Sequence, residues 1–506
     1  MPPPSQPRVV VVGGGITGLV AAYRLRAARI GGVAPEVTLV ESSPRVGGKL
    51  RTAEVAGCVV ECGPDSFVVR KPEAAELCTD LGLAEDLLVP AASGAYVWAR
   101  ERLVEFPPGS AFGIPSSLES IARWPGLSPG GRAVAALDLW RGVPRSAREA
   151  DDEPAAALVA RRLGREAADV LVLPVLAGIH AADPDRMSIA ATFPELRTWE
   201  LGYGSLMRGA RSARRSASRA PHAPPPLFAT LDGGLERLAG ALADAIGREA
   251  VLTGMAVDRI DRDGDAAYAV VAGGRRLPVD AVVVAAPAAA AAATLAELAP
   301  TAAAAARELR TASTATVTLV YPAGTGARLP VATGFLVPRR RDRRDSRTEP
   351  RVITACTWLS RKWPDDSFGD RAVVRCFVGR DGEQEALALD DAELARAVAA
   401  DVELATPVGV APAASLVTRW PDGMPQYDVG HLGRVAGIED ALLAAAPGVV
   451  VAGAPYRGVG IADCVRQGAE AAEAVVEHLA KTGSPAEPGE GPAPAGGRTE
   501  EAAWTK

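Results

Sequence analysis

The segment "RVVVVGGGITGLVAAYRLRAARIGGVAPEVTLVE" (8–41) decides the fold of this chain. Its four valines predict a buried strand, "ITGLVAAYRLRAA" predicts a helix, and "EVTLVE" predicts a second strand. Gly13, Gly15 and Gly18 lie at the turn between the first strand and the helix, and Glu41 ends the second strand. This glycine spacing in a strand–helix–strand unit predicts a dinucleotide-binding α/β fold with a parallel sheet.

Each of these positions has a physical role in holding a dinucleotide. The first glycine permits the tight turn, the second lets the backbone approach a pyrophosphate, and the third lets the helix pack closely on the strand. The diphosphate would rest on the N-terminus of the helix, at Ile16 and Thr17. Glu41, followed by Ser42, would bind an adenosine ribose and repel a 2′-phosphate, which disfavours NADP. A glycine-rich turn without a ligand is the alternative.

The composition favours a globular protein of two or three domains. The chain has 506 residues, of which 48% are hydrophobic, and a net charge of -6 from 55 basic and 61 acidic residues. This balance gives no general reason to expect a nucleic acid or an anionic membrane surface as a partner. Six scattered cysteines and four histidines disfavour a zinc site.

No targeting or transmembrane segment is predicted. The N-terminal stretch "MPPPSQPRVVVVGGG" lacks the charged and apolar regions of a signal peptide. The uncharged run 281–296 approaches the length of a membrane span, but Pro287 divides it, so a strand, a turn and a helix fit better. We therefore expect a cytoplasmic protein with reduced thiols.

The sequence pattern changes several times along the chain. Helical stretches broken by Pro and Gly run from about 107 to 200, and alternating runs such as "TATVTLVYP" predict an antiparallel sheet. The basic run 339–347 is predicted to be a solvated loop. The expected organisation is a dinucleotide-binding domain (8–90, 227–304, 446–480), a sheet domain (91–106, 305–445), a helical lobe (107–200), a linker (201–226) and a disordered tail (481–506).

A second strand, glycine-rich turn and helix lie near the C-terminus, in "GVVVAGAPYRGVGIADCV". Gly453 and Gly460 permit close approach of the backbone to a ligand, and Ile461 and Ala462 begin the helix. Unpaired N–H groups at a helix N-terminus stabilise negative charge, so this turn is a second candidate part of the site. Asp463, in the first helical turn, is either a stabilising helix-start charge or a cofactor contact.

The segment "ESSPRVGGKLRT" (41–52) resembles the extended fingerprint of the superfamily of FAD-dependent amine oxidases, phytoene desaturases and protoporphyrinogen oxidases. In that superfamily this segment runs along the diphosphate, and the C-terminal strand rejoins the sheet to bring its helix to the pyrimidine end of the flavin. The resemblance implies a Rossmann-like domain with non-covalent FAD and Cys464 as a packing residue. It also implies cofactor contacts at Arg45, Gly48, Lys49, Gly63, Pro64, Asp65, Ser66 and Val257. Lys49 stands where the superfamily usually has an arginine.

Four stretches narrow the resemblance to the oxygen-dependent porphyrinogen oxidases: "ECGPDSFVVRKPE" (61–73), "LPVLAGIHAADPDRMSIAATFPEL" (173–196), "FATLDGGLERLAGAL" (228–242) and "GAPYRGVGIADCVRQG" (453–468). Lys49 and the forms "GPDSF" and "GVGIADC" are most similar to the Gram-positive branch, which acts on coproporphyrinogen III. The resemblance spans about 8–480. It implies an FAD-binding domain, an antiparallel-sheet substrate domain and an inserted helical lobe.

This resemblance implies removal of six electrons from a porphyrinogen in three flavin cycles, with O2 as acceptor and hydrogen peroxide as product. Hydride would leave a ring carbon for the flavin, so no side chain is predicted to be catalytic. The residues implied to bind the four-carboxylate substrate are Lys71, Arg70, Gly178 and Trp358. Trp358 and Leu359 are equally explained as sheet core. His180 is a candidate base, but packing or shape is the favoured interpretation.

Three other functions stay open from the sequence. Oxidation of protoporphyrinogen IX uses the same fold and chemistry on a substrate with two propionates. A flavin amine oxidase or carotenoid desaturase is the second alternative, and a flavin-binding redox sensor without turnover is the third. The sequence also leaves open whether a ferrochelatase docks to receive the product.

Overall fold

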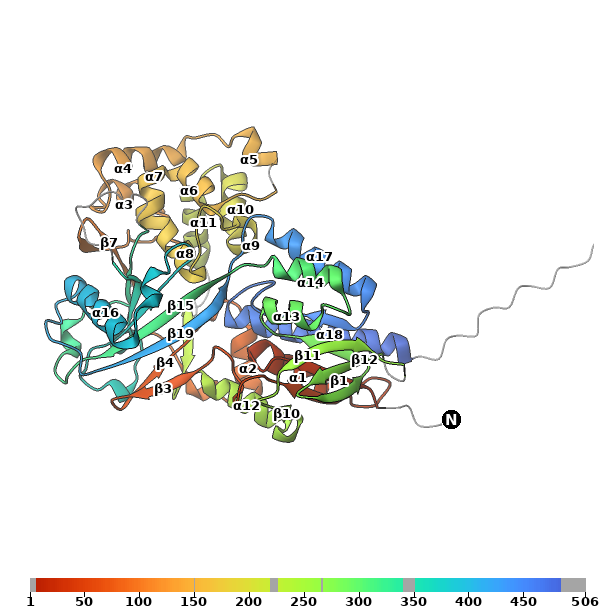
Figure 1. Ribbon diagram of the computed structural model, residues 1–506. Coiled ribbons are helices and arrows are strands. Elements are labelled where there is room, and N and C mark those ends of the chain that lie inside the picture. The colour runs from red at the N-terminus through yellow and green to blue at the C-terminus, as the bar shows by residue number, and fades with distance from the viewer. Residues whose placement is uncertain (1–5, 150, 219–225, 265–266, 340–350, 484–506) are drawn as a thin grey trace, which may run out of the picture.

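The computed structural model describes residues 6–149, 151–218, 226–264, 267–339 and 351–483. Figure 1 shows a helical lobe at the top, a large sheet below it and an α/β domain at the lower right. The predicted α/β class is confirmed. Most of the predicted tail lies outside the described residues, but its first three residues, 481–483, continue the last helix.

A parallel sheet of five strands forms the centre of the α/β domain, in the order β10-β2-β1-β14-β20. Its strands are β1 (Arg8–Val12), β2 (Glu36–Val40), β10 (Val251–Leu252), β14 (Ala281–Val284) and β20 (Val449–Val451). All neighbouring pairs are parallel, as the strand–helix–strand pattern predicts. Val449 lies opposite Val282, so the C-terminal strand does rejoin this sheet.

Helices cover both faces of the parallel sheet. Val9 and Val11 of β1 pack into one core, and Val10 and Val12 pack into the other. The first core contains α1 (Ile16–Ala27), α2 (Glu73–Asp80), α12 (Glu236–Ile246) and α18 (Ile461–Gly483), and the second contains α13 (Ala288–Thr294), α14 (Pro300–Arg307) and α17 (His431–Ala445). Burial on both faces explains why β1 and β14 are continuous apolar runs.

A seven-stranded sheet forms the second domain, in the order β19-β15-β18-β17-β16-β7-β8. Its strands are β7 (Tyr96–Ala99), β8 (Arg102–Glu105), β15 (Thr311–Val320), β16 (Gly334–Leu336), β17 (Ile353–Trp358), β18 (Val373–Val378) and β19 (Ala414–Pro425). Only the pair of β16 and β7 is parallel. Helix α16 (Asp391–Ala405) packs on one face, so residues from two distant segments share this core.

The helical lobe packs around its own hydrophobic core, which includes Leu158, Leu171 and Leu176. Its helices are α3 (Leu118–Ala122), α4 (Pro129–Ala136), α5 (Arg145–Glu149), α6 (Ala155–Leu163), α7 (Arg165–Ala167), α8 (Leu173–His180), α9 (Ile189–Thr192), α10 (Pro194–Tyr203) and α11 (Leu206–Ser218). A short π-helical turn, Ala168–Val172, directly precedes α8. The lobe therefore presents the end of α8 to the other two domains.

Two segments differ from the predicted organisation. The linker predicted for 201–226 is helical up to Ser218, because Leu206, Met207 and Ala210 form a buried face against the lobe. Of the Arg and Ser residues that suggested a loop, Arg214, Arg215 and Ser216 are exposed, whereas Arg211 is half-buried and donates to the carbonyl of Ser116 at 3.0 Å. Helix α17 falls within the predicted sheet segment 305–445 but packs on the α/β domain through its apolar face.

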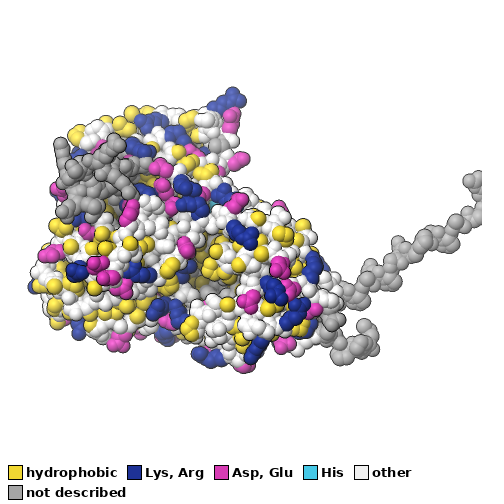
Figure 2. Space-filling view, viewed as in Figure 1, with side chains coloured by type: hydrophobic (Ala, Val, Ile, Leu, Met, Phe, Trp, Pro, Cys, Tyr) yellow, Lys and Arg dark blue, Asp and Glu magenta, His cyan; other side chains and the backbone are white. Residues whose placement is uncertain are grey.

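The surface gives no sign of a large charged partner on the face that Figure 2 shows, because basic and acidic side chains are interspersed there. Among the helices that the structure describes, none combines the length and apolar character that a membrane span needs.

Candidate functional site

The glycine turn after β1 leaves open space where the sequence predicts a diphosphate. Gly13 has a φ of +104°, and a Cβ on Gly18 would lie 1.9 Å from the carbonyl oxygen of Gly13. A Cβ on Gly15 would meet nothing within 4 Å. No side chain caps α1, and its first turn carries no acidic residue. Its first N–H groups are therefore available to an anion.

Glu41 lies at the end of β2, directly beside this turn. Its carboxylate accepts hydrogen bonds from the N–H of Gly14 at 2.6 Å and the N–H of Ser43 at 2.7 Å. The N–H of Met255 donates to the carbonyl of Glu41 at 2.9 Å. This bond brings Val257, the first residue of β11 (Val257–Arg262), to the same end of the site. The structure thus brings together the residues predicted for the ribose and the adenine.

A second glycine turn lies against the first. The N–H of Gly47 donates to the carbonyl of Gly14 at 2.7 Å, and a Cβ on Gly48 would lie 3.3 Å from the Cα of Gly15. The guanidinium of Arg45 donates to the carbonyl of Gly48 at 2.6 Å. Arg45 was predicted to contact the cofactor. In this structure its guanidinium holds the shape of the loop.

Lys49 is a cation without a protein partner at this second turn. No hydrogen bond or ion pair joins its ammonium group to another described residue. Its side chain is exposed to solvent. Burial lowers the pKa of Lys49, and Cys464 acts in the opposite direction. An exposed cation without a protein partner beside a diphosphate turn fits an anionic cofactor.

A buried ion cluster holds the "GPDSF" loop from behind. Lys362 donates to Asp65 at 2.9 Å, and Arg375 lies 3.4 Å from the same carboxylate. Burial alone would raise the pKa of Asp65, but the two cations hold it below its usual range. Arg375 also donates to the carbonyl of Gly63 at 2.7 Å, which fastens the loop to β18. The hydroxyl of Ser66 also donates to Asp65 at 3.0 Å, so three protein groups already surround this carboxylate.

The C-terminal turn brings a second helix N-terminus to the first. A Cβ on Gly453 would lie 3.4 Å from the hydroxyl oxygen of Thr17 in α1. Ile461 and Ala462, the first residues of α18, are buried in the core that α1 shares. Burial raises the pKa of the Cys464 thiol to about 11, so this residue is a neutral packing group. The two turns predicted to bind one cofactor are therefore neighbours.

Lys71 and Asp463 form an ion pair at the start of α18. The ammonium nitrogen of Lys71 lies 2.6 and 2.8 Å from the two carboxylate oxygens of Asp463. The side chain of Lys71 is 52% exposed, so a ligand can reach it. Arg70, its neighbour, is exposed and makes no hydrogen bond or ion pair with the rest of the described chain. Lys71, one of the predicted substrate cations, therefore lies at the start of α18, just after the C-terminal turn.

These features fit the binding of FAD. The open space at Gly15 and the uncapped α1 suit the diphosphate, and Glu41 and Val257 lie at one end of the turn. Lys49 and the start of α18 would meet the flavin end. The described residues hold no cluster of three or more His, Cys, Asp or Glu that could bind a metal ion.

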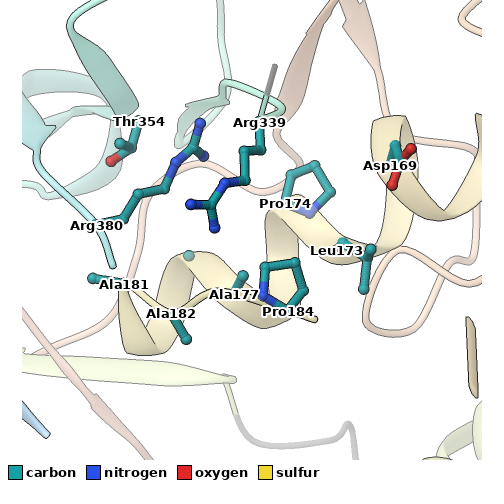
Figure 3. A pocket seen from close by; sticks show the side chains of 11 residues that line it. Asp169, Leu173, Pro174, Ala177, Ala181, Ala182, Pro184, Arg339, Thr354 and Arg380 are labelled. Atoms are coloured by element: carbon teal, nitrogen blue, oxygen red, sulfur yellow. The ribbon is translucent and has the colours of Figure 1, made fainter. Parts of the chain in front are cut away.

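A pocket lies between α8 and one end of the interior strands β16, β17 and β18 of the large sheet (Figure 3). Gly178 lines it from α8, and the side chains of Arg339 and Arg380 reach into it from the sheet. The two guanidinium groups share the carboxylate of Glu383, at 3.0 and 2.6 Å. A Cβ on Gly178 would lie 3.8 Å from Leu336, so the glycine leaves open space rather than a close protein contact. The pocket combines cations with a small-residue wall.

Both arginines of the pocket were missed in the sequence. Arg339 is the first residue of the basic run predicted to be a solvated loop, and Asp183 lies 3.2 Å from its guanidinium. The remainder of that run, 340–347, lies outside the described residues. Arg380 is the second residue after the buried strand β18, and a charge just beyond an apolar strand was its one sequence signal.

Trp358 lies in the core of the large sheet and is 0% exposed. Its ring packs against Tyr96 with centroids 5.8 Å apart and against Phe335 with centroids 6.1 Å apart. A substrate could contact Trp358 only if these neighbours moved. In this structure Trp358 is therefore part of the sheet core, which was the alternative to a substrate contact.

The chain is similar to known proteins over most of its length. A family model described as flavin containing amine oxidoreductase matches residues 16–476. The chain is 35% identical to coproporphyrinogen III oxidase of Bacillus subtilis (strain 168), over 93% of this chain and 98% of that protein. It is 30% identical to coproporphyrinogen III oxidase of Staphylococcus aureus (strain NCTC 8325 / PS 47), over 93% and 99%. A solved structure from Exiguobacterium sp. 255-15, provisionally named protoporphyrinogen oxidase, matches with a TM-score of 0.81 and 32% identity, over 94% and 99%.

Proposed function

This chain belongs to the flavin containing amine oxidoreductase family and, within it, to the group of the coproporphyrinogen III oxidases, and from that membership we propose that it oxidises coproporphyrinogen III to coproporphyrin III in haem biosynthesis. The reaction removes six electrons and six hydrogen atoms from the macrocycle. Three molecules of O2 accept them and leave as three molecules of hydrogen peroxide. The enzyme is thus an FAD-dependent oxidoreductase.

The set of cations at the substrate side supports a substrate with four carboxylates. Lys71 lies at the start of α18, and Arg339 and Arg380 line the pocket beside Gly178. Charge-assisted hydrogen bonds from such groups are the usual partners of carboxylates. A substrate with four propionates offers more carboxylates to these three cations than protoporphyrinogen IX, which has two.

The residues of the chain would position both reactants and stabilise charge. FAD supplies the two-electron chemistry when it is bound. The N–H groups of α1 would hold the diphosphate and Glu41 the ribose. The N–H groups at the start of α18 and the ammonium group of Lys49 would stabilise negative charge at the flavin end. Lys71 and the two pocket arginines would orient the macrocycle.

The test compares two substrates with the FAD-loaded enzyme in air. Porphyrin fluorescence and peroxide release are measured with coproporphyrinogen III and with protoporphyrinogen IX, after subtraction of spontaneous oxidation. We expect a higher kcat/KM for coproporphyrinogen III and three peroxides per porphyrin. A preference for protoporphyrinogen IX would overturn the proposed substrate, and oxidation of neither would overturn the proposed activity.

Handover of the product to a ferrochelatase is a further part of the proposal. It predicts that a porphyrin-binding trap protein captures less product when a ferrochelatase is present than when it is absent, with an unchanged peroxide yield. Iron is left out of this experiment so that the product is not consumed. Equal capture under both conditions would show release into solution.

A further inference from the structure

Two cysteines lie directly opposite each other on neighbouring strands of the large sheet. Cys356 of β17 is paired with Cys376 of β18 in an antiparallel register. Directly opposite residues project from the same face of a sheet, so their side chains are neighbours. Both side chains lie in the core that α16 covers, where Cys356 is 2% and Cys376 is 0% exposed. The fold thus places two free thiols side by side in one core.

The backbone of Cys356 is hydrogen-bonded to the strand on its other side. In an antiparallel sheet, opposite residues alternate between pairs that exchange backbone hydrogen bonds and pairs that do not. The N–H of Trp358 donates to the carbonyl of Thr333 at 3.0 Å, so these two residues form a bonded pair. Cys356 lies two residues before Trp358 and opposite Phe335 in the same register, so the alternation bonds it to Phe335 of β16. The backbone groups of Cys356 therefore point away from β18.

Cys376 follows the same rule on the next strand. The N–H of Tyr321 donates to the carbonyl of Ala372 at 2.9 Å, between the ends of β15 and β18. Cys376 lies four residues after Ala372 and opposite Val317, so the alternation bonds its backbone to β15. Cys356 and Cys376 are therefore a non-hydrogen-bonded pair, in which the Cα atoms lie about 4.5 Å apart. A disulfide requires Cα atoms about 4.4–6.8 Å apart, so this pair meets that requirement.

Burial makes this pair of thiols slow to react. It raises the pKa of Cys376, and the neighbouring thiol of Cys356 adds to the rise. A thiol reacts with peroxide as its thiolate, so a protonated and buried thiol reacts slowly. The pair becomes accessible when the strands open locally. Oxidation would therefore require sustained exposure to peroxide.

We propose that Cys356 and Cys376 form a reversible disulfide that is made by the hydrogen peroxide released in turnover, a source of oxidant that rests on the proposed function. One thiol attacks peroxide; the O–O bond breaks, one water leaves and a sulfenic acid remains. The second thiol attacks that sulfur; the S–S bond forms, the S–O bond breaks and a second water leaves. The two thiols together lose two electrons and two protons, and one peroxide becomes two waters. The proposed reaction releases this oxidant at every flavin cycle.

The disulfide would join two strands that carry functional side chains. Between the two cysteines, the chain carries Lys362 and Arg375, which hold Asp65 behind the "GPDSF" loop. Beyond the cysteines, Thr354 and Arg380 line the pocket beside α8. A disulfide raises stability mainly because it restricts the unfolded chain. The oxidised enzyme would therefore unfold at a higher temperature and keep these side chains in place.

The first test counts thiols in the FAD-loaded wild type, with all samples kept in the dark. One sample receives added hydrogen peroxide, and two receive coproporphyrinogen III in air, one of them with catalase. Each sample is denatured and alkylated, and its mass and peptides are analysed. We expect two of the six cysteines to escape alkylation, a cross-linked peptide that joins Cys356 to Cys376, and recovery of both thiols with dithiothreitol. Catalase should prevent the loss during turnover.

Two variants separate this pair from the other buried cysteines. Cys376→Ala removes one partner, and Cys78→Ala removes a thiol that is 0% exposed in a different core. On oxidation, we expect the thermal midpoint to rise by several degrees in the wild type and in Cys78→Ala. Cys376→Ala should show no such rise and no cross-linked peptide.

Retention of all six thiols with added peroxide, or a cross-link between other cysteines, would overturn the proposed pair. A bridge that forms with added peroxide but not during porphyrin formation, or that forms equally with catalase, would overturn released peroxide as the oxidant. Absence of porphyrin formation would instead overturn the proposed function, and the sample with added peroxide would still test the pair.

Discussion

The nucleotide side and the substrate side of this site consist of different kinds of chemical groups. At the turn from Gly13 to Gly18, the site consists of backbone N–H groups and of space left by missing side chains. On the substrate side, charged side chains from distant segments pair with one another, such as Lys71 with Asp463. The nucleotide side therefore depends on the local conformation of the backbone, whereas the substrate side depends on the pairing of charges between distant segments.

Removal of a charge that pairs across distant segments, in the buried cluster behind the "GPDSF" loop, should have the largest effect. Asp65→Asn leaves Lys362 and Arg375 buried without their carboxylate, and breaking such a cluster costs about 3–5 kcal/mol. We expect the free energy of unfolding in urea to fall by this amount. Asp80→Asn removes the exposed partner of Arg24 and is expected to cost less than about 1 kcal/mol. Equal losses in the two variants would contradict the account of the buried cluster.

Two glycine substitutions test whether the nucleotide side depends on space alone. Gly15→Ala puts a methyl group into the open recess at a φ of -70°, which alanine accepts, so we expect an unchanged apoprotein midpoint. FAD affinity should fall at least tenfold, about 1.4 kcal/mol. Gly18→Ala overlaps the carbonyl of Gly13, so it should lower both FAD affinity and apoprotein stability, the latter by about 1–3 kcal/mol.

The control for these variants is Gly240→Ala, since a Cβ on Gly240 also meets nothing within 4 Å and lies far along the chain in α12. Its FAD affinity should equal that of the wild type. Retention of full FAD affinity by Gly15→Ala would contradict the placement of the diphosphate. FAD affinity is measured by flavin fluorescence and stability by thermal unfolding of the apoprotein.

The same difference explains how much the sequence could predict. The turn at Gly13 and the helix start at Ile461 were found because strand, glycines and helix are consecutive in the chain. Arg339 and Arg380 could not be found in this way, because they meet only through the folding of the large sheet against α8. Helix α11 was missed because its buried face has only three core residues among many Arg and Ser residues.

A titration of Glu61 offers a smaller effect beside the buried cluster. Burial raises the pKa of Glu61 to about 7, although the N–H of Leu235 and the charge of Arg375 lower it. The unfolded value is about 4.3, so the folded protein binds more protons between these two pH values. Stability therefore falls as pH rises through this window.

Glu61→Gln removes this titration without a large change in shape. We expect the wild type to lose about 2 kcal/mol relative to Glu61→Gln as the pH rises from about 5 to about 8. Urea unfolding at several pH values measures the difference. Parallel pH curves for the two proteins would mean that Glu61 is ionised in the folded state throughout this range.

Lys71→Ala should give the smallest change in stability and a selective change in substrate binding. The Lys71 ammonium group is half-exposed, and exposed ion pairs contribute about 0–1 kcal/mol. We expect the thermal midpoint to change little, whereas KM for coproporphyrinogen III should rise about tenfold, about 1.4 kcal/mol. KM for protoporphyrinogen IX should rise less, because that substrate has two carboxylates fewer.

Asp463→Asn is the informative partner variant. It frees Lys71 from its ion pair, so KM for the four-carboxylate substrate should fall or stay unchanged. A rise in KM with Asp463→Asn equal to that with Lys71→Ala would show that the intact pair, rather than the free cation, is what the substrate requires.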